Sequence, residues 1–284
     1  MADNFNPADI KALAFDLDGT LLRTDKVLSG RTLKALRSCM DRGIRVILST
    51  GRAVESGEVY RKIIGAAGPQ VYYNGAEVVE MPGGKSIFTR FIDTEPVAYA
   101  ASLAEELGVY FQVYFPSGTI GEGEVLMANR LGEESDYYRR MSGVQAIAGD
   151  LGGCLSKVKQ LIKGLFITGE EHQRKIRSAL DRRCGTSIYV VSSSARYLEV
   201  LANGVSKGVG LAYALKHLGI KARETLVFGD EENDLPMFAA AGFSAAPANA
   251  RPPLLEAATF RIASNDEDGP AAFLEEKFPP LERI

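Results

Sequence analysis

The stretch KALAFDLDGT (residues 11–20) is the most informative part of this chain. Its first half is a short apolar run, typical of a strand that is covered on both faces in a parallel sheet. Asp16 and Asp18 follow directly at the end of this run. Because residues two apart in an extended segment point to the same side, the two carboxyl groups can share one site. Gly19 then allows the chain to turn sharply.

The first 83 residues continue this alternation of strand and helix. Apolar runs predict strands at 44–49 and 71–73, and helices are expected at 33–40 and 54–64. Strands that alternate with helices imply crossover connections and a parallel sheet.

The pattern changes after Pro82–Gly84 and changes back at Ser206. Short strand-like pieces with antiparallel character lie between these points, and the helix–strand alternation then resumes. We therefore predict an α/β fold with a doubly wound, mostly parallel, Rossmann-like core sheet. The core is assigned to residues 1–83 and 196–284, and an inserted α+β domain to residues 84–195.

Composition excludes several classes of protein. The chain has 284 residues, 33 Lys and Arg against 36 Asp and Glu, and no basic run with interleaved aromatics, so binding to nucleic acid or anionic membranes is not expected. No segment has the features of a signal peptide or a spanning helix. Three widely spaced cysteines, without a CxxC pair, are typical of reduced thiols in a cytoplasmic protein. No feature of the sequence indicates an oligomeric state.

Carboxylates must carry the acid–base chemistry, because the chain has only two histidines. An Asp with an ordinary pKa of about 3.9 is ionised at neutral pH and can attack phosphorus to form an acyl phosphate. The second Asp of the pair could donate a proton to the leaving oxygen if its neighbour raises its pKa. A calcium loop does not fit, since Leu21 stands where that loop needs glycine.

Three further polar clusters fall at the ends of predicted strands or the start of a helix. Thr50-Gly51-Arg52 offers a hydroxyl and a glycine amide for phosphate oxygens. Lys207 opens a helix, where its charge opposes the helix dipole. Gly229–Asp234 supplies carboxylates of the kind that hold Mg²⁺.

Each cluster alone has an ordinary interpretation: a solvated turn, a helix N-cap, a surface lysine or an acidic helix cap. Ligands of open parallel sheets bind beyond the carboxyl ends of the strands, so all four clusters at such ends favour one functional site. A near match to a calcium loop at Ser264–Glu275 lacks Asp at its first position, and we interpret it as a loop that leads into the C-terminal helix.

With these motifs in place, the sequence resembles the haloacid dehalogenase superfamily, in particular its Cof-type phosphatases with a large inserted α/β cap (class IIB). The matching segments are FDLDGTLL (15–22), LSTGR (48–52), YYNGA (72–76), LEVLANGVSKG (198–208), GDEENDLPMF (229–238) and SNDEDGPAAFL (264–274).

The resemblance implies a role for each residue of the site. Asp16 is the nucleophile and a magnesium ligand. Asp18 is the general acid and then the base for water, and its backbone carbonyl binds the metal, with Asp230 as the third protein ligand. The phosphate-binding residues implied are Thr50, Gly51, Lys207 and Asn233. The supporting residues implied are Asp234, Arg52 and Asn74.

The function predicted is therefore a Mg²⁺-dependent phosphatase of a small phosphorylated metabolite, such as a sugar phosphate or a related phosphomonoester. Two alternatives stay open. A phosphosugar mutase of the same superfamily would yield isomerised sugar phosphate in place of free phosphate. A non-catalytic metabolite-binding regulator could keep the fold, although it would not need an acid–base pair.

The resemblance also implies that the cap closes over the site and selects the leaving group. Hinges are expected near Pro82–Gly84 and Ala202–Gly204. The glycine-containing segment Phe115–Glu124 is expected to be a flexible loop that reaches the site, so that shortening it would change substrate preference.

Overall fold

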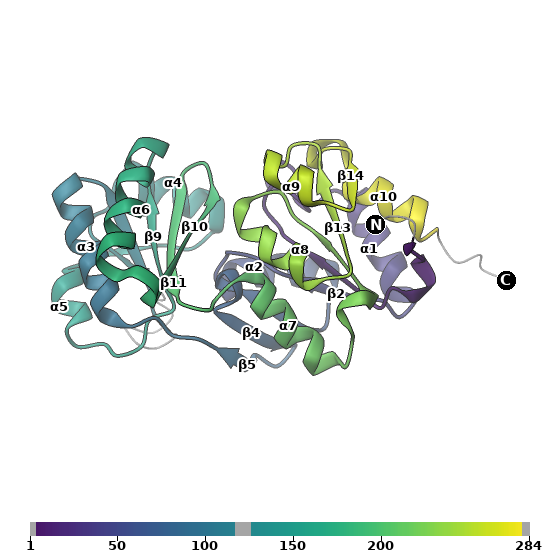
Figure 1. The fold of residues 1–284 in the computed structure, drawn as a ribbon, viewed down its shortest axis with the longest axis horizontal. Coiled ribbons are helices and arrows are strands. Elements are labelled where there is room, and N and C mark those ends of the chain that lie inside the picture. Colours follow the sequence, from purple (N-terminus) through teal and green to yellow (C-terminus); the bar gives the residue numbers. More distant parts are fainter. Residues whose placement is uncertain (1–3, 117–125, 280–284) are drawn as a thin grey trace. The chain divides into compact units, whose positions relative to one another are not determined.

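The computed structural model describes residues 4–116 and 126–279, and the chain forms two compact units (Figure 1). One unit contains residues 1–88 and 206–284, and the other contains residues 89–205. Of the loop expected at Phe115–Glu124, residues 117–124 lie outside the described residues.

The boundaries of the inserted unit differ from residues 84–195 at both ends. Pro82–Gly84, expected as a hinge, is the turn between two strands, β4 (Glu77–Met81) and β5 (Lys85–Thr89), which lie side by side in one sheet. At the other end, β11 (Tyr197–Ala202) pairs with two strands of the inserted unit. Strand pairing therefore moves both boundaries toward the C-terminus.

The first unit is built on a parallel sheet with the strand order β14-β13-β12-β1-β2. Its strands are β1 (Ala12–Phe15), β2 (Arg45–Leu48), β12 (Thr225–Phe228), β13 (Phe243–Pro247) and β14 (Phe260–Ile262). A small sheet follows with the order β3-β4-β5, in which β3 (Gly68–Tyr72) runs antiparallel to β4. A bridge between Ser49 and Val71 connects the end of β2 to β3.

Six α-helices accompany these sheets within the described part of the unit. They are α1 (Gly30–Asp41), α2 (Val54–Ile64), α7 (Lys207–Leu218), α8 (Leu235–Ala240), α9 (Pro252–Ala257) and α10 (Gly269–Lys277). Single 3₁₀ turns occur at Pro7–Asp9, Tyr73–Gly75, Ala222–Glu224, Glu232–Asp234 and Asn265–Glu267.

The side chains of β1 alternate between two hydrophobic clusters, one on each face of the sheet. Leu13 and Phe15 lie in the cluster that includes α1 and α10, which pack together although they come from opposite ends of the chain (Figure 1). Ala12 and Ala14 lie in the cluster that includes α7 and α8. A central strand buried on both faces is the arrangement expected for a doubly wound α/β sheet, so the predicted fold class is confirmed.

The second unit is a six-stranded sheet with the order β10-β11-β9-β6-β7-β8, antiparallel except between β7 and β8. Its other strands are β6 (Tyr110–Tyr114), β7 (Leu126–Ala128), β8 (Ile147–Ala148), β9 (Lys163–Ile167) and β10 (Ile188–Ser194). Its helices are α3 (Thr94–Leu107), α4 (Glu133–Ser142), α5 (Leu151–Leu155) and α6 (Glu170–Cys184), with a 3₁₀ turn at Gly185–Ser187.

Two further sequence expectations concern membranes and cysteines. None of the helices in residues 4–116 and 126–279 is both long and apolar enough to cross a bilayer. Cys39, Cys154 and Cys184 are free thiols.

Replacement of Leu36 by Ala tests the packing of α1 on the sheet. Leu36 is completely buried among side chains of the first cluster, so Leu36→Ala should lower the free energy of unfolding by about 2–5 kcal/mol in a urea titration. Lys34→Ala, at an exposed position of the same helix, should change it by less than about 0.5 kcal/mol. Equal effects of the two changes would contradict this account of the core.

Candidate functional site

Three neighbouring parallel strands end at the site. β1 lies between β12 and β2, and the residues after these strands include Asp16, Asp230 and Thr50. The backbone N–H of Asp16 donates to the carbonyl of Phe228 at 3.0 Å, which continues the β1–β12 pairing to the aspartate itself. The strand order thus brings together residues far apart in sequence, as expected at the carboxyl edge of such a sheet.

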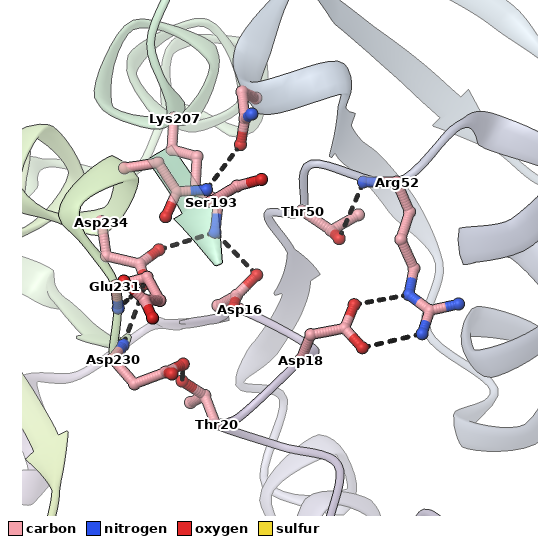
Figure 2. Close-up of polar contacts among 12 residues, drawn as sticks. Asp16, Asp18, Thr20, Thr50, Arg52, Ser193, Lys207, Asp230, Glu231 and Asp234 are labelled. Atoms are coloured by element: carbon pink, nitrogen blue, oxygen red, sulfur yellow. Dashed lines mark hydrogen bonds and ion pairs between the residues drawn. The ribbon is translucent and has the colours of Figure 1, made fainter. Parts of the chain in front are cut away.

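Lys207 connects two of the aspartates. Its Nζ donates to Oδ1 of Asp16 at 2.6 Å and to Oδ1 of Asp234 at 2.7 Å (Figure 2). The lysine is the first residue of α7, whose N-cap Ser206 accepts a hydrogen bond from the N–H of Val209. A lysine at this end of a helix gains nothing from the dipole, so its position is explained by the two carboxylates it holds.

Asp230 is held by its neighbours from two sides. Its Oδ1 accepts a hydrogen bond from the Thr20 hydroxyl at 2.5 Å, and its backbone N–H donates to Oδ2 of Asp234 at 2.9 Å. Gly19, with φ of +85°, passes so close that a Cβ there would lie 2.3 Å from Oδ2 of Asp230. The glycine after the aspartate pair is therefore required both for the turn and for the approach of Asp230.

Burial and mutual repulsion dominate the electrostatics of this cluster. Burial raises the pKa of Asp16 from 3.8 to about 7, with Lys207 opposing the shift and the charges of Asp234 and Asp18 adding to it. Burial also raises the pKa of Asp230, together with the charges of Asp16 and Asp234. Burial alone would lower the pKa of Lys207, but the two carboxylates beside it raise it instead.

On chemical grounds these carboxylates fit a cation site. Asp16, Asp230 and Asp234 each offer an oxygen within 4.8 Å of the others, and all three are buried. Among the described residues, Lys207 is the cation that pairs with Asp16 and Asp234, so the cluster has three carboxylates and one ammonium. A set of oxygen donors with excess negative charge fits a hard divalent cation, which would bring the raised pKa values down again.

The hydrogen bonds distinguish the three aspartates. One oxygen of Asp234 accepts from Lys207, and the other accepts from the backbone N–H groups of Asp230 and Glu231. Both oxygens of Asp234 are therefore occupied by the protein. Asp16 and Asp230 are the better candidates for direct contact with a metal, and Asp234 orients the residues around it.

Asp18 points away from this cluster, toward Arg52 (Figure 2). Its carboxylate accepts from Nε and Nη2 of Arg52 at 2.6 and 2.8 Å, and Nζ of Lys26 lies 2.9 Å from its Oδ1. Burial would raise the pKa of Asp18, but the hydrogen bonds and charges of Arg52 and Lys26 lower it to about 2. The proton-donor role predicted for Asp18 requires a raised pKa. In this arrangement the pKa of Asp18 is lowered instead.

The remaining predicted residues lie around Thr50 and Asn74, and all of them except the partly exposed Gly51 are buried. Thr50 accepts a hydrogen bond from the backbone N–H of Arg52 at 3.1 Å, with Gly51 between them. Asn74 donates from its backbone N–H to the carbonyl of Thr50 and accepts at Oδ1 from Nδ2 of Asn233 at 2.8 Å.

Sequence reasoning missed two residues of the site. Thr20 lies within the first motif and could have been recognised as a polar neighbour of the aspartates. Lys26 lies in a loop without any pattern and has a backbone φ of +66°, which no signal in the sequence indicates.

The near match to a calcium loop has a structural explanation. Asp266 accepts hydrogen bonds from the N–H and hydroxyl of Thr24, and Asp268 accepts two from Arg23. Asn265 donates to the carbonyl of Leu22. These side chains therefore hold the segment that follows Asp18 and Gly19, as partners of the protein.

Comparison with known proteins assigns the family. A model of the haloacid dehalogenase-like hydrolases matches residues 13–274. The chain belongs to this family. The resemblance found in the sequence is confirmed, and so is the enzyme class, because the curated relatives of this hydrolase are named as phosphatases.

Relatives of this hydrolase match over nearly its whole length. The 5-amino-6-(5-phospho-D-ribitylamino)uracil phosphatase YitU of Bacillus subtilis is 30% identical over 275 residues, covering 94% of this chain and 97% of that protein. HMP-PP phosphatase of Cronobacter sakazakii is 26% identical and covers 85% of each chain.

Solved structures show the same architecture. TM0651 of Thermotoga maritima has a TM-score of 0.77 at 29% identity and covers 94% of this chain and 97% of its own. The HAD subclass IIB sugar phosphatase BT4131 has a TM-score of 0.79 at 23% identity, covers 94% of this chain and 98% of its own, and shows that the fold is shared.

Titration with Mg²⁺ tests the cation site of this hydrolase. A ligand of the folded state alone should raise the free energy of unfolding by about 2.7 kcal/mol at 100 times its dissociation constant. The melting temperature of the wild type should rise accordingly with Mg²⁺, and Asp230→Asn should lose most of the shift. Asp41→Asn, on an exposed helix residue, should keep it. An equal shift in Asp230→Asn would place the cation elsewhere.

Stability as a function of pH tests the raised pKa of Asp16. Because its folded-state pKa of about 7 lies above the ordinary 3.8, the folded protein binds this proton more tightly than the unfolded chain does. The contribution of Asp16 to stability therefore falls as pH rises from 3.8 to about 7 and is level above that. In EDTA, wild type should lose stability relative to Asp16→Asn across this window in urea titrations. A difference that stays flat or grows with pH would disprove the assignment.

Proposed function

We propose that this hydrolase is a Mg²⁺-dependent phosphatase that cleaves a small phosphomonoester through a phosphorylated Asp16. The observation that carries this proposal is the position of the Asp16 carboxylate. It lies at the end of β1, 2.6 Å from a buried ammonium and beside two further buried aspartates. A nucleophile that attacks phosphate needs charge neutralisation and positioning more than it needs further covalent chemistry.

Lys207 and the metal have complementary tasks. The ammonium of Lys207, held between Asp16 and Asp234, reduces the repulsion between the attacking carboxylate and the anionic phosphoryl group. Asp16, Asp230 and the backbone carbonyl of Asp18 would hold Mg²⁺. When bound, Mg²⁺ would supply charge neutralisation for the displacement at phosphorus.

Asp18 is the proposed general acid and base. To protonate the leaving oxygen it must leave Arg52 and Lys26, since a carboxyl with a pKa of about 2 is ionised at neutral pH. The side chain of Asp18 is 33% exposed, whereas that of Asp16 is 7% exposed, so Asp18 is the freer of the two to change its rotamer. Arg52 and Lys26 then hold the carboxylate of Asp18 while no substrate is bound, and substrate binding releases it.

The phosphoryl group is proposed to be bound by residues of three segments. Thr50 and Gly51 follow β2, Lys207 begins α7, and Asn233 lies in the 3₁₀ turn after Asp230. Backbone N–H groups and the hydroxyl at this edge supply neutral donors, and Lys207 supplies the charge.

The substrate is proposed to be a sugar phosphate or a related phosphomonoester, with the inserted unit selecting the leaving group. Three relatives in Bacillus subtilis are named as phosphatases of 5-amino-6-(5-phospho-D-ribitylamino)uracil, which makes this compound the first to assay. Sugar phosphates and cofactor phosphates complete the screen, each with and without Mg²⁺.

Asp16→Asn tests the nucleophile in this screen. The wild type should release orthophosphate only with Mg²⁺, and Asp16→Asn should lower the rate by at least about 10³-fold, because an amide cannot form the acyl phosphate. Asp41→Asn should retain the wild-type rate.

The same assay separates the alternative functions. Isomerised sugar phosphate without free phosphate would identify a mutase. Absence of any turnover, together with full cellular function of Asp16→Asn, would identify a binding protein.

A further inference from the structure

The turn Tyr73–Gly75 has an unusual backbone. Its three residues all have positive φ, of 50° for Tyr73, 56° for Asn74 and 92° for Gly75. Left-handed conformations of non-glycine residues are unfavourable and persist where the surroundings fix them, often at binding sites. Two such residues in succession raise the question of what the turn positions.

The backbone of this turn connects two parts of the site. The N–H of Asn74 donates to the carbonyl of Thr50 at 2.9 Å, and the N–H of Tyr73 donates to that of Arg52 at 3.0 Å. Gly75 lies against the start of α7, where a Cβ would be 2.0 Å from the carbonyl oxygen of Ser206. Asn74 is therefore fixed between the Thr50 loop and the residue that precedes Lys207.

The side chain of Asn74 is completely buried and only half satisfied. Its Oδ1 accepts from Nδ2 of Asn233, which is 4% exposed. Within the described residues, Nδ2 of Asn74 and Oδ1 of Asn233 have no hydrogen-bond partner. Turning both amides by 180° would still leave one NH₂ group and one carbonyl oxygen without a partner. A buried polar group without a partner destabilises the folded protein, a cost that a purely structural amide pair would avoid.

We propose that Asn74 binds the transferring phosphoryl group, with its amide NH₂ donating to a phosphoryl oxygen. This inference rests on the proposed phosphatase function. The amide lies between Thr50 and the helix that begins with Lys207, and it is hydrogen-bonded to Asn233, so its neighbours are the proposed phosphate-binding residues. An anion with several acceptor oxygens satisfies the free NH₂ group, and a neutral donor adds no charge to compete with Lys207 for Asp16.

The pairing gives Asn74 a second effect. By accepting from Nδ2 of Asn233, it fixes the amide plane of that residue, so the two side chains form one rigid donor surface. Their contributions to phosphate binding should therefore be strongly non-additive.

Two variants of Asn74 separate the donor from the turn. Asn74→Asp keeps the size and the acceptor for Asn233 but replaces the NH₂ group with an anionic oxygen. Asn74→Gly removes the side chain and is well suited to φ of 56°, so the turn is retained. Asn6→Asp is the control for the added charge, since Asn6 is exposed, lies outside the site and caps a 3₁₀ turn through an oxygen that Asp also supplies; the change gives up only its exposed hydrogen bond to Asp9.

The readouts are kcat/KM and the affinity for orthophosphate with Mg²⁺, measured by calorimetry without turnover. Loss of one hydrogen bond to a charged group predicts a drop of about 10- to 100-fold in both for Asn74→Gly. Asn74→Asp should lose at least about 100-fold, because it adds repulsion to the lost donor. Adding Asn233→Ala to Asn74→Gly should cost less than the product of the single effects.

The inference is overturned if Asn74→Asp binds orthophosphate within about threefold of the wild type, since Asn74 would then serve Asn233 alone. If Asn74→Asp fails to fold, orthophosphate binding by Asn74→Gly within about threefold of the wild type overturns the inference instead. A wild type that binds no orthophosphate and releases none from any substrate would instead refute the proposed function.

Discussion

The ammonium of Lys207, shared between Asp16 and Asp234 in the protein interior, is the interaction on which the site depends. It joins the end of β1, the start of α7 and the turn after β12, three segments that are far apart in sequence. Removing such charges from water costs several kcal/mol each, and a buried ion pair often adds no net stability. The geometry of these ion pairs is thus better explained by the chemistry of the site than by a contribution to the stability of the folded protein. The lysine holds the carboxylate of Asp16 in place and opposes the rise in the pKa of that residue.

The other aspartates extend the same balance of charge. Asp230 can lie close to Gly19 because glycine has no side chain to block it. Both carboxylate oxygens of Asp234 accept hydrogen bonds from the protein, one from Lys207 and the other from backbone N–H groups. What remains is a pair of carboxylates, Asp16 and Asp230, whose pKa values burial raises. The protein thus supplies an excess of negative charge, of the kind that a bound divalent cation would balance. The charge of the Asp18 carboxylate, by contrast, is neutralised by two cations, Arg52 and Lys26. They hold its side chain away from this site in the arrangement seen here.

Much of this arrangement could be predicted from the sequence. Apolar runs that end in Asp16, Thr50 and Asp230 identify strands whose carboxyl ends share one edge, and the order of neighbouring strands then brings them together. The contact of Asp18 with Lys26 could not be predicted, because Lys26 lies in an irregular loop where it has a left-handed backbone. Pro82–Gly84 was mistaken for a hinge because a hairpin turn has the same residue types. Only the pairing of β4 with β5 distinguishes the two.

The most direct test of the charge balance is a crystal structure of the protein soaked in Mn²⁺, with anomalous diffraction used to locate the metal. The account predicts one strong peak that both Asp16 and Asp230 coordinate, with Lys207 still bound to Asp16 and Asp234. A peak away from these two carboxylates, or none at a saturating concentration of the metal, would contradict it.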